Sequence, residues 1–111
     1  MTNSRRKGAQ GEREAAKEIQ RIFGVEARRG RQYHGRDDAP DIVADIPGVH
    51  FEVKRVEKLR LYKALEQAAN DSAENVPCVL HRKNGEPWVI ALYLDDVVEF
   101  ASEIMETCNA K

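Results

Sequence analysis

The segment DIVADIPGVHFEVK, residues 41–54, alternates polar and apolar side chains on both sides of a proline–glycine pair. Such alternation is typical of strands and the pair is typical of a turn, so the segment predicts a β-hairpin. Side chains along a strand alternate between its two faces, so the second strand has one apolar and one polar face. The apolar face, expected in the core, carries Val49, Phe51 and Val53, and the other carries His50, Glu52 and Lys54.

If the proline–glycine pair forms a two-residue connection, Val43 lies opposite Glu52 and Asp41 lies opposite Lys54. Paired residues share a face, so Asp41, Glu52 and Lys54 converge, with side-chain origins roughly 5 to 8 Å apart. A shift of one residue in this register would separate them. His50 shares their face but lies at the far end of the hairpin from Asp41, where it is expected at the rim.

The stretch before this hairpin predicts an amphipathic helix over residues 9–23, which ends at Gly24. Its apolar stripe consists of Ala16, Ile19 and Phe23. One further step of four residues towards the N-terminus reaches Glu12, which therefore shares the inward face. A carboxylate on such a face needs a metal ion or a basic partner. A position at the frayed start of the helix is the alternative, and the spacing leaves both open.

The rest of the chain predicts further strands and helices around the hairpin. These elements are a short strand over 25–28, a helix over 59–74, strands over 77–83 and 87–94, and a C-terminal helix that Asp95 or Asp96 can cap. Asn84-Gly85 predicts a hairpin between the last two strands. The residues expected to face inward are Leu61, Leu65, Ala68 and Ala69 in the second helix, and Val97, Phe100, Ala101 and Ile104 in the last. The order is αββ(β)αββα, in one α/β domain over residues 1–111 with a flexible basic N-terminus at 1–7.

Charge is segregated along the chain, although the net charge is only −1. Up to residue 36 there are ten Lys and Arg residues against four Glu residues, whereas the segment from residue 95 is acidic. A basic first third predicts contact with a polyanion, and a solvated helix face is the alternative. The loop 29–36 is basic and carries glycines and an aromatic residue, which suits contact with phosphates and bases, although flexible surface loops have a similar composition.

Composition and cysteine spacing exclude several other classes of protein. The residues are 41% hydrophobic and 33% charged, which is typical of a globular protein. Cys78 and Cys108 lie far apart with no Cys-x-x-Cys unit, so neither a zinc site nor a disulfide is expected, and Cys78 is expected to be buried. Trp88 and Tyr93 are expected to pack in the core. No secretory or membrane-spanning stretch is present, so we expect a cytoplasmic protein with no membrane partner, acting in the host cytoplasm if it is phage-encoded.

The convergence of Asp41, Glu52 and Lys54 suits the hydrolysis of a phosphodiester. Two carboxylates and the carbonyl of Val53 can bind Mg²⁺, with Mn²⁺ as a substitute, and the ion can activate water and relieve charge at phosphorus. Lys54 can orient or deprotonate the attacking water, or neutralise charge in the transition state. The alternative is a surface ion pair between Lys54 and one of the carboxylates.

Pro40-Asp41 followed by Glu52-Val53-Lys54 resembles the core signature of the PD-(D/E)XK nuclease superfamily. The run KGAQGERE, residues 7–14, is similar to the opening of the archaeal and phage-type Holliday junction resolvases. The resemblance implies a restriction-endonuclease-like fold, with a central mixed sheet flanked by helices, and a homodimer that cuts four-way DNA junctions. It also implies that Glu12 joins the metal site and that Arg13 contacts DNA or the scissile phosphate.

Two features depart from these resolvases: residues 28–40 contain no serine, and this loop is longer and rich in Arg. Gln67 resembles a helical glutamine that some members of the superfamily use near the site, and a surface glutamine is the alternative. The residues expected to bind DNA are Arg5, Arg6, Lys7, Arg13, Arg29, Arg31, Tyr33, His34 and Arg36. The alternative functions are cleavage of flaps, nicked DNA or linear duplexes, and nucleic-acid binding without cleavage.

Overall fold

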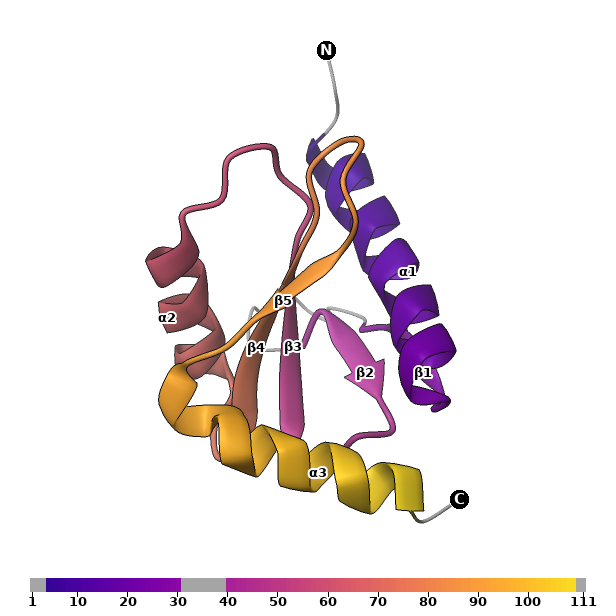
Figure 1. Cartoon of the computed structure of the whole chain (residues 1–111). Coiled ribbons are helices and arrows are strands. Elements are labelled where there is room, and N and C mark those ends of the chain that lie inside the picture. The colour runs from indigo at the N-terminus through magenta and orange to yellow at the C-terminus, as the bar shows by residue number, and fades with distance from the viewer. Residues whose placement is uncertain (1–3, 31–39, 110–111) are drawn as a thin grey trace.

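The computed structural model describes residues 4–30 and 40–109, and within these residues helices flank a mixed β-sheet (Figure 1). The elements in chain order are α1 (Ser4–Phe23), β1 (Ala27–Arg29), β2 (Ile42–Ala44), β3 (Val49–Lys54), α2 (Leu61–Asp71), β4 (Val76–His81), β5 (Val89–Ala91), the 3₁₀ turn η1 (Leu94–Asp96) and α3 (Val97–Asn109). This order confirms the predicted succession of helices and strands. The arrangement is compatible with a restriction-endonuclease-like fold.

The main sheet has the strand order β3-β4-β5, with β3 parallel to β4 and β4 antiparallel to β5. Helix α2 connects the two parallel strands, because parallel neighbours need a crossover rather than a tight turn. The predicted hairpin around Asn84-Gly85 is confirmed, since β4 and β5 pair on either side of it. Gly85 has a positive φ of 77°, a turn conformation that glycine adopts without strain.

The predicted hairpin between residues 41–46 and 49–54 is wrong. Strand β2 pairs with β1 in an antiparallel two-stranded sheet, with Arg29 opposite Ile42, and β3 pairs with β4, with Glu52 opposite Val79. The pairs predicted across the proline–glycine turn are therefore not formed. The local alternation was compatible with several partners, and each strand pairs along one edge with a strand that lies further away in the sequence.

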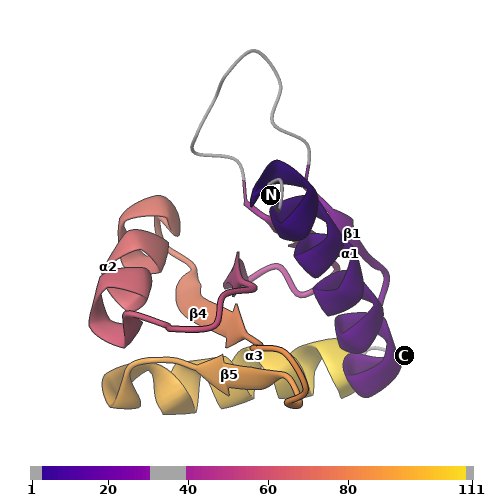
Figure 2. The ribbon, with the colours of Figure 1, turned by 90° about the horizontal axis from the view of Figure 1, so that it is seen from above.

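Two apolar clusters cover the two faces of β4. Cys78 and Leu80 belong to a cluster with α1, whereas Val79 belongs to a cluster with α2. The alternation of side chains along the strand thus explains why α1 and α2 lie on opposite sides of β3 and β4, as Figures 1 and 2 show. Cys78 is buried, and Trp88 and Tyr93 are half-buried against the two clusters, so these three predictions are confirmed.

Helix α1 begins at Ser4, five residues before the predicted start, and includes part of the stretch expected to be a flexible N-terminus. Its inward face carries Ala15, Ala16 and Ile19, which are all buried. It ends at Gly24, whose φ of 67° terminates the helix. The predicted bounds of α1 are therefore close to the observed ones, and its apolar stripe packs on the sheet.

The inward faces of the other two helices are narrower than predicted. Leu61 is 40% exposed, because it begins α2, and the buried residues of that helix are Ala64, Leu65 and Ala68. In α3, Phe100 and Ile104 pack against the core as predicted, but Val97 and Ala101 are exposed. Helix α3 crosses one end of the strands (Figure 1), so only a narrow stripe of it contacts the core. Over the described ranges, no helix combines the length and apolar character needed to cross a bilayer.

Candidate active site

The backbone around Asp41 is held by a close approach to Gly30. The N–H of Gly30 donates a hydrogen bond to the carbonyl of Asp41 at 2.8 Å, which extends the pairing of β1 and β2 by one residue. A Cβ at Gly30 would overlap the carbonyl oxygen of Pro40, so only glycine fits here without a shift. The position of Asp41 therefore depends on a glycine that lies eleven residues earlier in the chain.

The side chain of Asp41 connects β2 to β3 in place of the predicted strand pairing. Its Oδ2 accepts a hydrogen bond from the backbone N–H of Val53 at 2.8 Å. This contact brings the Asp41 carboxyl group within hydrogen-bonding reach of Glu52, the residue before Val53. Asp41 and Glu52 thus converge as the sequence indicated, although by a side-chain contact rather than by a ladder.

The environment of Asp41 disfavours its negative charge. Burial first, and then the charges of Glu52 and Glu12, raise its pKa from 3.8 to about 7, although the hydrogen bond from the Val53 N–H lowers it. A carboxyl group with such a pKa either keeps a proton at neutral pH or needs a nearby positive charge. The neighbouring carboxyl groups of Asp41 and Glu52 therefore favour a nearby positive charge.

Glu52 is held from its other side by His50. The Nε2 atom of His50 lies 3.1 Å from Oε1 of Glu52, and the two residues are each only 6% exposed. In the tautomer that carries its proton on Nε2, His50 donates to this carboxylate. The prediction that His50 lies at the rim is wrong, because helix α2 covers the second face of β3 as well. Sequence reasoning missed this contact, although two polar residues at strand spacing were its visible signal.

Glu12 lies half-buried on α1 and has a basic partner. Nε of Arg29 lies 2.6 Å from Oε1 of Glu12, so a basic partner, one of the two compensations that the sequence suggested for this carboxylate, is present. Both residues line an open cavity of about 470 Å³ together with Gly30 and Asp41. Arg29 was predicted to bind DNA, and in this structure it neutralises Glu12.

Lys54 ends β3 and contacts helix α2. Its Nζ donates a hydrogen bond to Oε1 of Gln67 at 2.7 Å. Among the described residues, Lys54 takes part in no ion pair, so the surface ion pair considered above is not formed. Both residues line an open pocket of about 220 Å³. Gln67 therefore lies beside Lys54. The sequence had indicated only weakly that this glutamine lies near the site.

A second residue missed from the sequence is Arg55, which follows Lys54 directly. Its side chain is only 13% exposed and lies 3.7 Å from the carboxylate of Glu14 on α1. It also donates to Oδ1 of Asn84 at 2.9 Å and to the carbonyl of Arg82 at 3.3 Å. A largely covered guanidinium with partners on two segments fixes the end of β3 against α1 and the β4–β5 connection. The short pattern around Glu52 gave no signal for it.

The other residues predicted to bind DNA are only partly described. Arg13 is exposed on α1, next to Glu12 in the sequence. Arg5, Arg6 and Lys7 lie in the first turns of α1, and their side chains lie outside the described ones. The predictions for Arg31, Tyr33, His34 and Arg36 fall outside the described residues.

The donors around Asp41 fit a magnesium-like ion. Among the described residues, no three His, Cys, Asp or Glu side chains are gathered tightly enough to form a metal site as they stand, and Glu12 is engaged by Arg29. Asp41 and Glu52 offer two carboxylates. The carbonyl of Val53 lies on the same edge of β3 as its N–H, which faces Asp41. Mg²⁺ usually keeps several waters and binds through one or two carboxylates, so this oxygen set suits it.

The comparisons with known proteins identify the family of this chain. A family model described as "Phage putative PDDEXK endonuclease" matches residues 3–110, nearly the whole chain. No curated protein and no solved structure gives a significant match. The matched range includes Asp41, Glu52 and Lys54, the residues that carry the resemblance to the PD-(D/E)XK signature. The chain therefore belongs to the phage PDDEXK endonuclease family, and so to the PD-(D/E)XK nuclease superfamily.

Proposed function

We propose that this nuclease is a divalent-cation-dependent DNA endonuclease whose catalytic side chains are Asp41, Glu52 and Lys54, with Glu12 as a fourth member. The observation that supports it most is the hydrogen bond from the Val53 N–H to Asp41, which sets a carboxyl group with a pKa of about 7 beside Glu52. Mg²⁺ is the proposed cation, with Mn²⁺ as a substitute, because the available donors are all oxygens.

Each side chain has a role that its position supports. When bound, Mg²⁺ neutralises charge on the phosphate and makes water a better nucleophile. Asp41, Glu52 and the Val53 carbonyl would hold the ion. Lys54, whose ammonium group is positioned by Gln67 at 2.7 Å, donates hydrogen bonds to the attacking water or to the phosphate and so stabilises the negative charge of the transition state.

We further propose that the substrate is branched DNA, specifically a four-way junction, and that the active form is a homodimer. This part rests on the resemblance of residues 7–14 to the opening of the junction resolvases. Resolution of a junction needs two incisions, and a two-fold symmetric dimer supplies two equivalent sites. The exposed Arg13, which follows Glu12, is proposed to contact the DNA near the scissile phosphate.

Cleavage assays on an immobile four-way junction, a flap and a linear duplex, with Mg²⁺ and with a chelator, test the proposal. We expect cleavage only with Mg²⁺, fastest on the junction, and a loss of at least about a hundredfold in Asp41→Asn, Glu52→Gln and Lys54→Ala. Equal rates in the parent and all three variants would show that the catalytic assignment is wrong. Cleavage of all three DNAs at one rate would overturn the substrate alone, and binding without cleavage would indicate a non-cleaving module. Sedimentation of the free protein tests the dimer.

A further inference from the structure

A second basic surface lies next to the candidate active site, on the segment that joins β3 to α2 and on the first turn of α2. Lys58, Arg60 and Lys63 are all exposed there, four to nine residues after Lys54. In the part of the chain that the structure describes, none of these three side chains belongs to an ion pair. Their positive charges are therefore not neutralised by those carboxylates. The sequence patterns had placed the DNA contacts only in the first third of the chain.

Arg60 and Lys63 line the same open pocket as Lys54 and Gln67. This pocket holds about 220 Å³, and its lining within the described residues contains three cationic side chains and no Asp or Glu. Helix α2 starts beside it with no acidic residue in its first turn. A hollow with this charge favours an anion, and its openness to solvent suits a group that belongs to a long polymer.

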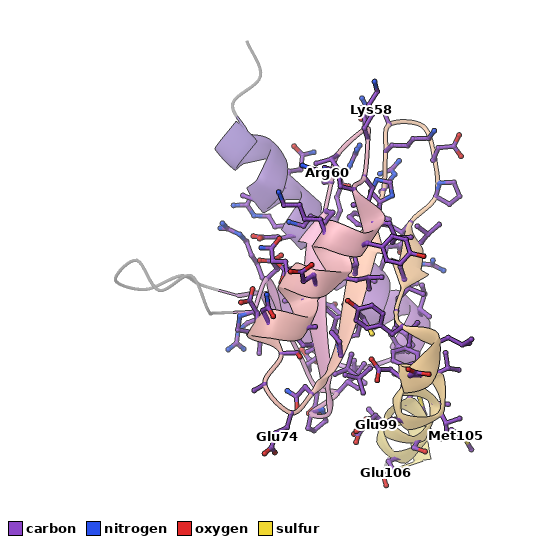
Figure 3. All side chains as sticks on the ribbon, turned by 90° about the vertical axis from the view of Figure 1, so that its left-hand side faces the viewer. Lys58, Arg60, Glu74, Glu99, Met105 and Glu106 are labelled. Atoms are coloured by element: carbon purple, nitrogen blue, oxygen red, sulfur yellow. The ribbon has the colours of Figure 1, made fainter. Side chains whose placement is uncertain are left out.

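The positions of the charged residues labelled in Figure 3 support the same direction of approach. Figure 3 shows Lys58 and Arg60 at one end of the molecule, and Glu74, Glu99 and Glu106 at the opposite end. The first end is where β3 finishes at Lys54 and leads into the basic segment. A polyanion is attracted to this end and repelled from the acidic one, so the field of the protein orients DNA towards the proposed site.

Three of the four candidate catalytic residues line two hollows. The cavity of about 470 Å³ contains Asp41 and Glu12, and the pocket of about 220 Å³ contains Lys54. The Val53 backbone, bonded to Asp41 and adjacent to Lys54 in the chain, joins the two. Suppose that the scissile phosphate of a DNA strand lies between the two hollows. A neighbouring phosphate of the strand then lies near each hollow, since phosphates follow each other closely along the backbone.

We propose that Arg60 and Lys63, with Lys58 at the edge, bind a phosphate of the DNA backbone next to the scissile one and so fix the strand across Lys54. This inference rests on the proposed nuclease function and adds a contact region that lies on α2 rather than on α1. The contact is with phosphate, so it contributes affinity and position without sequence preference. It acts on binding and not on the chemical step.

The test compares Arg60→Gln/Lys63→Gln with the control Lys17→Gln/Arg21→Gln, which removes the same charge from the outer face of α1. Anisotropy titrations use a labelled immobile four-way junction in chelator at several salt concentrations. We expect the first variant to bind roughly tenfold more weakly and its slope of log affinity against log salt to fall by about 1 to 2. The control should stay close to the parent, and Arg60→Lys/Lys63→Arg should keep the parent slope.

Cleavage kinetics with Mg²⁺ separate the possible outcomes. We expect the KM of Arg60→Gln/Lys63→Gln to rise roughly tenfold while kcat stays within about twofold, as for a contact made equally in ground and transition states. If the parent cuts DNA but this variant matches the control in slope and KM, the phosphate contact is wrong and the nuclease function stands. If the parent neither binds nor cuts DNA, both are wrong.

Discussion

Replacing Asp41 with asparagine is expected to stabilise the cation-free protein above neutral pH while it abolishes cleavage. The substitution removes the negative charge but keeps an oxygen that can accept a hydrogen bond from the Val53 N–H. In the parent this hydrogen bond is 2.8 Å long. The raised pKa of Asp41, about 7 against 3.8, means that its ionisation costs free energy in the folded state. The ionised form of Asp41 therefore lowers the stability of the folded protein.

The magnitude follows from the two pKa values. Each pKa unit corresponds to about 1.4 kcal/mol, so the full cost of the ionised Asp41 is at most about 4 kcal/mol above pH 7. Part of this cost remains in the variant, because the amide of asparagine is also desolvated. We expect Asp41→Asn to raise the free energy of unfolding by about 1 to 3 kcal/mol at pH 8.

The pH dependence has a definite sign. Between pH 4 and pH 7 the folded protein binds a proton at Asp41 that the unfolded chain has lost, since the folded pKa is about 7 and the ordinary value is 3.8. The contribution of Asp41 to the free energy of unfolding therefore falls as pH rises through this interval. The gain in Asp41→Asn should consequently be larger at pH 8 than at pH 5.

Urea denaturation in chelator at both pH values measures this difference, with Asp45→Asn as the control. Asp45 is exposed in the same segment and should change stability by less than about 0.5 kcal/mol. Addition of Mg²⁺ should stabilise the parent and not Asp41→Asn. The reasoning is refuted if Asp41→Asn is less stable than the parent at pH 8, or if its gain is the same at pH 5.

Three shorter predictions concern other residues. Gly30→Ala should lower the free energy of unfolding by about 1 to 3 kcal/mol and the cleavage rate at least tenfold, because the new Cβ would overlap the backbone beside the site. Denaturation and cleavage kinetics measure the two effects. Gly8→Ala, where a Cβ meets open space, should change neither. His50→Ala should weaken Mn²⁺ binding about 10- to 100-fold in calorimetry, and His50→Gln should restore part of it, unless the contact with Glu52 has no role. Cys78, buried and with a pKa raised to about 12, should resist iodoacetamide in the native protein, as mass spectrometry would show; ready alkylation would contradict its burial.

Local patterns in the sequence identified the elements and their faces. The period of two along residues 49–54 correctly placed Phe51 in the core, because side-chain direction along a strand depends only on the backbone next to it. The spacing of Ala16 and Ile19 likewise identified the buried face of α1. The identity of these buried faces does not depend on which helix or strand packs against them.

The partners themselves depended on contacts that local patterns do not contain. The turn residues within 41–54 predicted that the two adjacent strands pair with each other, but β2 pairs with β1 and β3 pairs with β4. Once α2 covered the second face of β3, His50 became a buried neighbour of Glu52 instead of a rim residue. A residue such as His50 is buried only if a second layer covers the polar face of its strand, and the sequence of the strand predicts a layer on its apolar face alone.

By itself the sequence determined which residues belong to the candidate site, because the proline–aspartate pair and Glu52-Val53-Lys54 carry their identity in their order. The tertiary structure alone decided the contacts of these residues: Asp41 accepts a hydrogen bond from the Val53 N–H and lies within reach of Glu52, whereas Lys54 donates to Gln67. It also decided the pKa of Asp41, since burial and the charges of neighbouring carboxylates arise only when distant segments pack together.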